Sequence, residues 1–201
     1  MKISKITPQK RNKNRCSVYI DGQYSFGVTK ELIHKYDLTE DNEITEEEIQ
    51  NLLLHDEREK IKSRAYRLLS FRERSAAEMR ARLLKAGYDS SLVDDVIEDL
   101  VASDTLNDER FAALFVKDYT NLKPKGNRFI VHELTKKGIA RQTIEKVLAI
   151  RDERKLMQQF MQRKLKNLDA RDFRDRQKIA RRLLQRGFTP HIVYDVLNQQ
   201  K

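Results

Sequence analysis

The sequence predicts a mainly α-helical protein, in which three tandem three-helix repeats form an elongated, curved array behind a small N-terminal β-hairpin segment. An internal repeat is the main observation, because Gly87, Gly138 and Gly187 follow one another at intervals of about 50 residues. Apolar residues recur at equal offsets from each glycine, in three sets: Met79, Leu83, Tyr88, Val96 and Ile97; Ile130, Leu134, Ile139, Val147 and Leu148; Ile179, Leu183, Phe188, Val196 and Leu197. The absence of tryptophan, with only three prolines and six glycines, also favours helix.

The first 54 residues differ from the repeats and are predicted to contain strands. The segment 16–28 reads as two short strands around an Asp-Gly turn, and Val18, Ile20, Tyr24 and Phe26 alternate as one half-buried face would. We expect a third strand from Ile3 and Ile6, before the polar loop 8–15, and a short helix after the cap Thr29. Another helix opens at a capping box of Thr45 and Glu48 and breaks near His55-Asp56.

The repeats are predicted to cover residues 55–102, 103–151 and 152–201. Each holds three helices, which we place at 57–71, 75–86 and 90–102; at 107–120, 127–137 and 141–150; and at 152–167, 172–186 and 190–200. Phe111 and Phe160 agree across the second and third repeats, since both lie 27 residues before the glycine of their repeat. Since each repeat contacts mainly its neighbours, thin helical layers are expected rather than one thick core.

Local signals mark the ends of these helices. Ser75 and Glu78 form a capping box at the start of one helix, and Gly87 is a left-handed residue at its end. Thr189-Pro190 is an N-cap followed by proline at the first helical position. Ala140 occupies the equivalent cap in the second repeat, where it is a poor cap, so we expect that helix to fray more readily.

Composition restricts the class of protein. Charged residues make up 36% of the chain, and no apolar run approaches the roughly 20 residues of a membrane span. The N-terminus lacks the apolar stretch of a signal peptide, and the single cysteine, Cys16, forms no internal disulfide. We expect a cytoplasmic, monomeric protein with no membrane contact.

No motif for catalysis is recognisable. The sequence has no glycine-rich phosphate loop and no serine in a glycine elbow, and its four histidines are scattered. His132-Glu133 lacks the second histidine of a zinc helix, so a surface or half-buried pair is the simpler reading. We therefore predict no enzyme activity, no cofactor and no metal.

The net charge of +10 is distributed in alternating blocks. Basic blocks lie at 1–36, 58–86, 117–141 and 151–187, and acidic blocks at 37–57 and 87–110. The blocks suggest basic stripes that face a polyanion or an acidic protein, although solubility alone would also explain them.

Within the second helices of the repeats, the basic side chains that point away from the apolar stripe, or flank it as Arg80 does, are the candidate contacts. These are Arg80, Arg82 and Lys85 in the first repeat; Lys136 in the second, with Lys123, Lys125 and Arg128 just upstream; and Lys178, Arg181 and Arg182 in the third. A row of such groups would follow a phosphate backbone or an acidic protein wall. Phe129 either points outward with them or packs on the preceding loop.

Three stretches resemble the RecX family, the bacterial regulators of the RecA recombinase. They are 69–79, with Arg72, Arg74 and Ser75; 106–115, with Asn107 to Phe111; and 125–139. Met79 and Asn107 replace a leucine and an aspartate that are common in the family, and both keep the packing or capping role. Arg72 and Arg74 belong to the signature and are candidate partner contacts, although each could instead cap a carbonyl or pair with a carboxylate.

The resemblance implies a non-enzymatic regulator that binds RecA, chiefly as its filament on single-stranded DNA. The family inhibits the recombinase, ATPase and coprotease activities of RecA, and a row of basic faces could lie in the filament groove. A rival hypothesis is a helical-repeat protein that binds single-stranded DNA or RNA directly, without a RecA target.

Overall fold

The computed structural model describes residues 1–199. It begins with β1 (Ile3–Pro8), β2 (Arg15–Ile20) and β3 (Gln23–Thr29). Helices then follow in this order: α1 (Lys30–Lys35), α2 (Glu46–Leu69), α3 (Ala76–Lys85), α4 (Ser90–Ala102), α5 (Asp108–Asn121), α6 (Asn127–Lys136), α7 (Arg141–Ala149), α8 (Glu153–Lys164), α9 (Phe173–Gln185) and α10 (Pro190–Asn198). The mainly helical class is confirmed. Residues 200 and 201, where the last predicted helix was to end, lie outside the described part.

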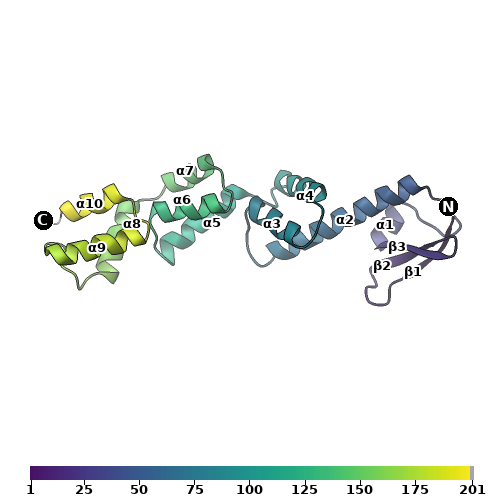
Figure 1. The fold of residues 1–201 in the computed structure, drawn as a ribbon, viewed down its shortest axis with the longest axis horizontal. Helices are drawn as coiled ribbons and strands as arrows, with labels where there is room; N and C mark the ends of the chain where they lie inside the picture. Colours follow the sequence, from purple (N-terminus) through teal and green to yellow (C-terminus); the bar gives the residue numbers. More distant parts are fainter. Residues whose placement is uncertain (200–201) are drawn as a thin grey trace. The chain divides into compact units, whose positions relative to one another are not determined.

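The chain forms two compact units, whose helices and strands are labelled in Figure 1. One unit consists of residues 1–71 and 83–96, and the other of residues 72–82 and the chain from Ile97 on. Helix α3 therefore contributes to both units.

The N-terminal strands form an antiparallel sheet in the order β1-β2-β3. Val18, Ile20 and Phe26 are buried, as predicted, but Tyr24 is 59% exposed. The pairing shifts between Val18 and Tyr19, so that Tyr24 pairs with Tyr19 rather than with Ile20. This bulge moves Tyr24 to the other face of the sheet, where its ring lies 5.9 Å from that of Tyr19.

Helix α2 is continuous from Glu46 to Leu69, so the predicted break near His55-Asp56 is wrong. Asp56 is buried within the helix and binds Arg15 of the sheet through two bonds, of 3.0 and 2.8 Å. Lys60, one turn further along, lies 3.0 Å from the same carboxylate. Burial opposes the ionisation of Asp56, but these two cations outweigh it and lower its pKa. A paired carboxylate can thus stay inside a helix that its polarity alone appeared to interrupt.

Most predicted caps are confirmed. Thr45 and Glu48 form the capping box, and Thr29 accepts a hydrogen bond from the Leu32 amide. Gly87, Gly138 and Gly187 all have positive φ, of 90°, 76° and 81°. In this left-handed region a side chain would add strain, so glycine is the natural residue for these helix ends.

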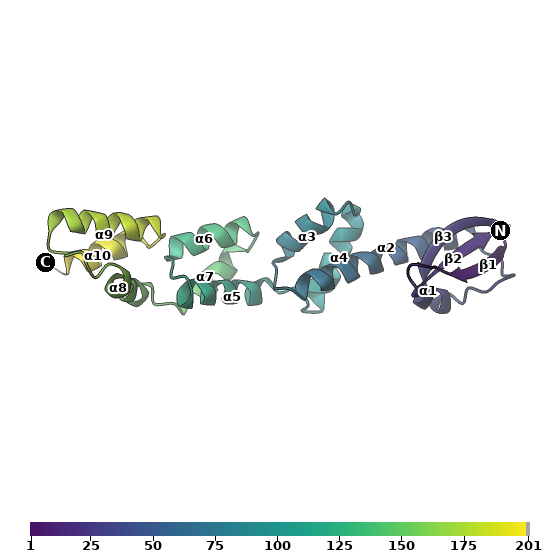
Figure 2. The same cartoon turned by 90° about the horizontal axis from the view of Figure 1, so that it is seen from below.

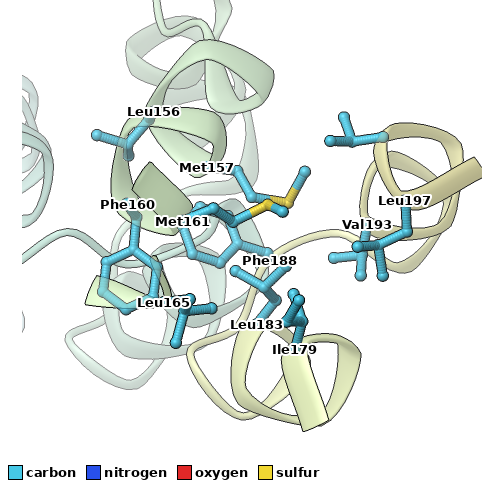
Figure 3. Packing of buried hydrophobic residues seen from close by; sticks show 11 residues of the cluster. Leu156, Met157, Phe160, Met161, Leu165, Ile179, Leu183, Phe188, Val193 and Leu197 are labelled. Atoms are coloured by element: carbon cyan, nitrogen blue, oxygen red, sulfur yellow. The ribbon is translucent and has the colours of Figure 1, made fainter. Parts of the chain in front are cut away.

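The repeated apolar positions are core positions. Met79, Ile130 and Ile179 are at most 1% exposed, and the equivalent leucines four residues on, Leu83, Leu134 and Leu183, are fully buried. Figure 3 shows the core of α8, α9 and α10, where Met157 and Met161 face Phe188, Ile179 and Leu183. The same three helices form one group in both Figure 1 and Figure 2.

The end of α6 meets the start of α3. Ser75 Oγ accepts a hydrogen bond from the Glu78 amide (3.1 Å), as predicted for a cap, and also donates to the Lys137 carbonyl (2.7 Å). A Cβ on Gly138 would lie 2.5 Å from the Cβ of Ala77. The free donors at a helix start and the free carbonyls at a helix end therefore lie against each other. We call such a contact between two helix ends a joint.

The same joint recurs between α9 and α6. The amides of Gly126 and Arg128 donate to the carbonyls of Arg186 and Gly187, at 3.1 and 3.0 Å. A Cβ on Gly126 would lie 2.1 Å from backbone atoms of Phe188. The two helix ends are thus as close as their backbones allow.

A carboxylate at the start of a later helix completes each joint. Asp108, the first residue of α5, accepts from the Ala76 amide at 2.8 Å. Glu153, the first residue of α8, is 4% exposed and accepts from the amides of Asn127 (2.7 Å) and Thr189 (3.1 Å). The Thr189 hydroxyl donates to Glu153 instead of capping its own helix. These carboxylates satisfy helix-start amides that would otherwise be unpaired.

Candidate functional site

Three of the candidate arginines converge on one carboxylate. Arg74 Nη1 lies 2.8 Å from Glu78 Oε1, and Arg82 Nε lies 3.2 Å from the same oxygen. Arg72 binds both oxygens of Glu78, with Nη1 3.1 Å from Oε2, and also donates to the Glu73 carbonyl. Lys137, across the joint with α6, lies 3.8 Å from Oε2.

These cations fix the ionisation of Glu78. Burial raises the pKa of this carboxyl, but the hydrogen bonds from Arg72 and Arg82, with the positive charges of Arg72 and Lys137, lower it to about 2. The carboxylate is therefore charged at neutral pH and offsets part of the surrounding charge.

The arginines of this cluster differ in exposure. Arg74 is only 5% exposed, so it holds the fold and is removed from the set of candidate contacts. The side chains of Arg72 and Arg82 are about half exposed, at 47% and 49%. Lys85 is exposed and Arg80 half-buried. Arg110, from the second stretch that resembles the family, pairs with Glu73 at 2.8 Å and with Asp104 at 3.0 Å.

The candidates of the second repeat do not form one cluster. Lys136 lies 3.9 Å from Glu133, and Arg128 is exposed at the joint with α9. Lys123 and Lys125 line a hollow of about 650 Å³ beside the connection between α5 and α6. Phe129 packs inward rather than pointing to solvent, with its ring 5.0 Å from that of Tyr119.

The candidates of the third repeat lie on α9. Lys178 pairs with Asp175 at 2.9 Å, and this bond is the main cause of a lowered pKa of Asp175. Arg181 lines a hollow of about 880 Å³ between α9 and α10, together with the exposed rings of Phe173 and Tyr194. Arg182 lines a different hollow, of about 370 Å³.

Sequence reasoning missed three cations that line the same hollows as Lys123, Lys125 and Arg182. Arg163, Lys164 and Arg186 line the same or the adjoining hollow, although they come from two other helix ends. The basic block 151–187 was the available signal, but it gave no reason to single out these residues.

Arg151 holds the connection that forms one wall of these hollows. Its guanidinium donates to the hydroxyl of Thr120 (2.9 Å), the side-chain oxygen of Asn127 and the carbonyls of Tyr119 and Lys125. Burial lowers the pKa of Arg151. With this many acceptors, its role is to fix the connection rather than to bind a partner.

Residues 1–199 contain no group of three or more histidine, cysteine, aspartate or glutamate side chains that could hold a metal ion. Among the helices of these residues, none is both long enough and apolar enough to span a membrane.

Family models match the chain in four consecutive segments. They are described as the regulatory protein RecX N-terminal domain (residues 1–45) and the first (62–100), second (107–148) and third (150–197) three-helix domains of RecX. The last three descriptions agree with the three repeats predicted from the glycine spacing.

Full-length relatives and solved structures agree. The chain is 33% identical to the regulatory protein RecX of Listeria monocytogenes serovar 1/2a over 96% of this chain and 73% of that protein. It is 29% identical to that of Clostridium beijerinckii over 98% and 95%. A crystal structure of regulatory protein RecX matches with a TM-score of 0.77 and 26% identity, covering 98% of both chains. RecX from Lactobacillus salivarius has the same fold, with a TM-score of 0.65. The names of these relatives describe regulatory proteins rather than enzymes, and the chain belongs to the RecX family of regulatory proteins.

Proposed function

We propose that this protein binds RecA and the RecA filament on single-stranded DNA, and inhibits the recombinase, ATPase and coprotease activities of RecA. Family membership supports RecA as the target, because regulation of RecA defines the family that the sequence resembles. The protein would lie in the filament groove and exclude duplex DNA or repressor from it.

The observation that carries this proposal is a set of cations without a carboxylate partner. In the part of the chain that the structure describes, no carboxylate lies within ion-pair distance of Lys85, Lys123, Lys125, Arg181 or Arg182. By contrast, Arg72, Arg82, Lys136 and Lys178 are paired with carboxylates and are weaker candidates. Because no carboxylate neutralises them, these cations on α3, α9 and the connection before α6 keep their attraction for an acidic protein wall or a DNA strand.

Charge reversal tests the proposal through the ATPase activity of RecA on single-stranded DNA. Arg181→Glu with Arg182→Glu is expected to weaken inhibition about tenfold, because two repulsive contacts replace two attractive ones. Arg82→Glu with Lys85→Glu should act in the same direction, although the first change also removes a partner of Glu78. A matched control is Lys117→Glu with Lys155→Glu, which reverses two exposed charges elsewhere. If variants that remain folded by circular dichroism inhibit as well as the control, these cations serve only solubility.

One observation favours direct binding of single-stranded nucleic acid as a second function. The exposed rings of Phe173 (71%) and Tyr194 (49%) line the same hollow as Arg181, and exposed aromatic rings in a hollow with an arginine are suited to stacking with bases. Binding to naked single-stranded DNA at several salt concentrations separates the two functions. Tight binding with a steep salt dependence supports direct recognition, and weak binding with strong binding to RecA-coated DNA supports the RecA target.

A further inference from the structure

Two adjoining hollows in the second compact unit share four lining residues, Lys125, Phe160, Lys164 and Arg186. Their walls come from three segments that are far apart in the sequence. These are the end of α5 with its connection to α6, one face of α8 from Leu156 on, and the last turn of α9. We treat them as one basic hollow.

Every charged residue that lines the basic hollow is a cation. The six are Lys123, Lys125, Arg163, Lys164, Arg182 and Arg186. Within residues 1–199, no carboxylate lies within ion-pair distance of any of them. Because a concave surface of one sign concentrates its electrostatic potential, the ligand of this hollow must be an anion.

Two of the cations are held in place before any ligand arrives. Arg186 donates to the Pro124 carbonyl at 2.9 Å, and its guanidinium lies over the Phe160 ring, 4.4 Å from the centroid. The ammonium of Lys125 lies 4.6 Å from the centroid of the Phe129 ring. Since little side-chain freedom is left to lose, binding of an anion costs less entropy here than on a mobile surface.

The hollow also has an apolar part. Leu122 is 74% exposed on the connection, next to the lining side chains of Leu156 and Phe160. The Phe160 ring is already covered by Arg186, so it is not free to stack on a base. An aliphatic or aromatic side chain of a ligand would cover Leu122, which a phosphodiester backbone would leave in water.

The side-chain amides of the hollow bear on whether the anion is a peptide or a phosphate group. Asn121, Gln159 and Gln185 line the hollow, and each carries both donors and an acceptor. A peptide backbone offers donors and acceptors in return, whereas phosphate oxygens only accept. The amides therefore suit a peptide better than a phosphate group alone, and the apolar part favours a peptide over a nucleic acid strand.

We propose that the basic hollow binds an acidic peptide segment that carries one bulky apolar side chain. Carboxylates of the segment pair with the six cations, and the apolar side chain packs on Leu122 and Leu156. This deepens the proposed function and rests on it for the source of the segment, which is a surface-exposed acidic stretch of the protein partner.

Fluorescence anisotropy with short labelled peptides tests the site without RecA, so that its outcome is separate from that of the ATPase assay. The probe is a peptide of alternating glutamate and glycine with one central leucine. Three comparison probes replace the leucine by serine, replace the glutamates by glutamine, or are an oligothymidylate of equal net charge. The wild type should bind the probe at least about tenfold more tightly than any comparison probe.

Arg163→Glu with Lys164→Glu should weaken binding of the probe by at least about tenfold, and Lys117→Glu with Lys155→Glu should not. Leu122→Ser should weaken the leucine peptide several-fold and leave the serine peptide unchanged. Equal or tighter binding of the oligothymidylate would overturn the proposal in favour of a phosphate site. Failure to bind any peptide, or equal effects of Leu122→Ser on both peptides, would overturn it as well.

Discussion

Replacing Glu78 by glutamine should destabilise the protein at neutral pH, because it removes the negative charge that Arg72, Arg74, Arg82 and Lys137 surround. Glutamine has nearly the same shape and can still accept one guanidinium hydrogen bond. The substitution therefore isolates the charge of Glu78 from its packing.

The lowered pKa sets the size of the effect. A change from 4.5 to about 2 corresponds to roughly 3.5 kcal/mol, at about 1.4 kcal/mol for each pKa unit. The Glu78 side chain is 15% exposed, but Arg72 and Arg82 are half exposed and water screens their attraction. We therefore expect Glu78→Gln to lower the free energy of unfolding by about 1–2 kcal/mol.

The effect has a defined dependence on pH. Folding lowers the pKa of Glu78, so its contribution is complete above pH 4.5 and disappears as the pH falls towards about 2. The stability difference between wild type and Glu78→Gln should narrow over this window. Other carboxylates titrate in both proteins and cancel in the comparison.

Urea unfolding followed by far-ultraviolet circular dichroism, at pH 7 and at several acidic values, measures this difference. Glu145→Gln is the matched control, because the pair of Glu145 with Arg141 is exposed, at 62% and 91%. It should leave the transition midpoint unchanged. Equal midpoints for wild type and Glu78→Gln at pH 7, or a difference that persists at pH 2, would refute this account of the cluster.

Three further substitutions test the joints. Ser75→Ala removes the helix cap and the bond to the Lys137 carbonyl, so it should cost about 1–3 kcal/mol in thermal melts, while filament binding of the folded variant is retained. Gly126→Ala should cost at least about 2 kcal/mol, because its Cβ would meet Phe188; an unchanged melting temperature would show that the joint yields. Glu153→Ala should destabilise more than Glu153→Gln, which keeps an acceptor for the buried amides; equal melting temperatures would contradict this role.

The sequence by itself determined the repeat and the local structure. Positions such as Leu83, Leu134 and Leu183 recur with helical spacing, and a glycine ends each of these helices because a left-handed residue is needed there. Caps such as Ser75 involve residues only three positions apart, so a linear pattern contains all the partners they need.

Only the tertiary structure decided which cations gather in the basic hollow. The pair of Arg82 with Glu78, four positions apart on one helix, can be read from a helical projection, but the hollow that Arg182 lines cannot. Arg163 and Lys123 meet in that hollow although 40 positions separate them. The projection gives the direction of a side chain from its own helix. The other side chains of the hollow come from other segments, and the close joints between helix ends bring those segments together.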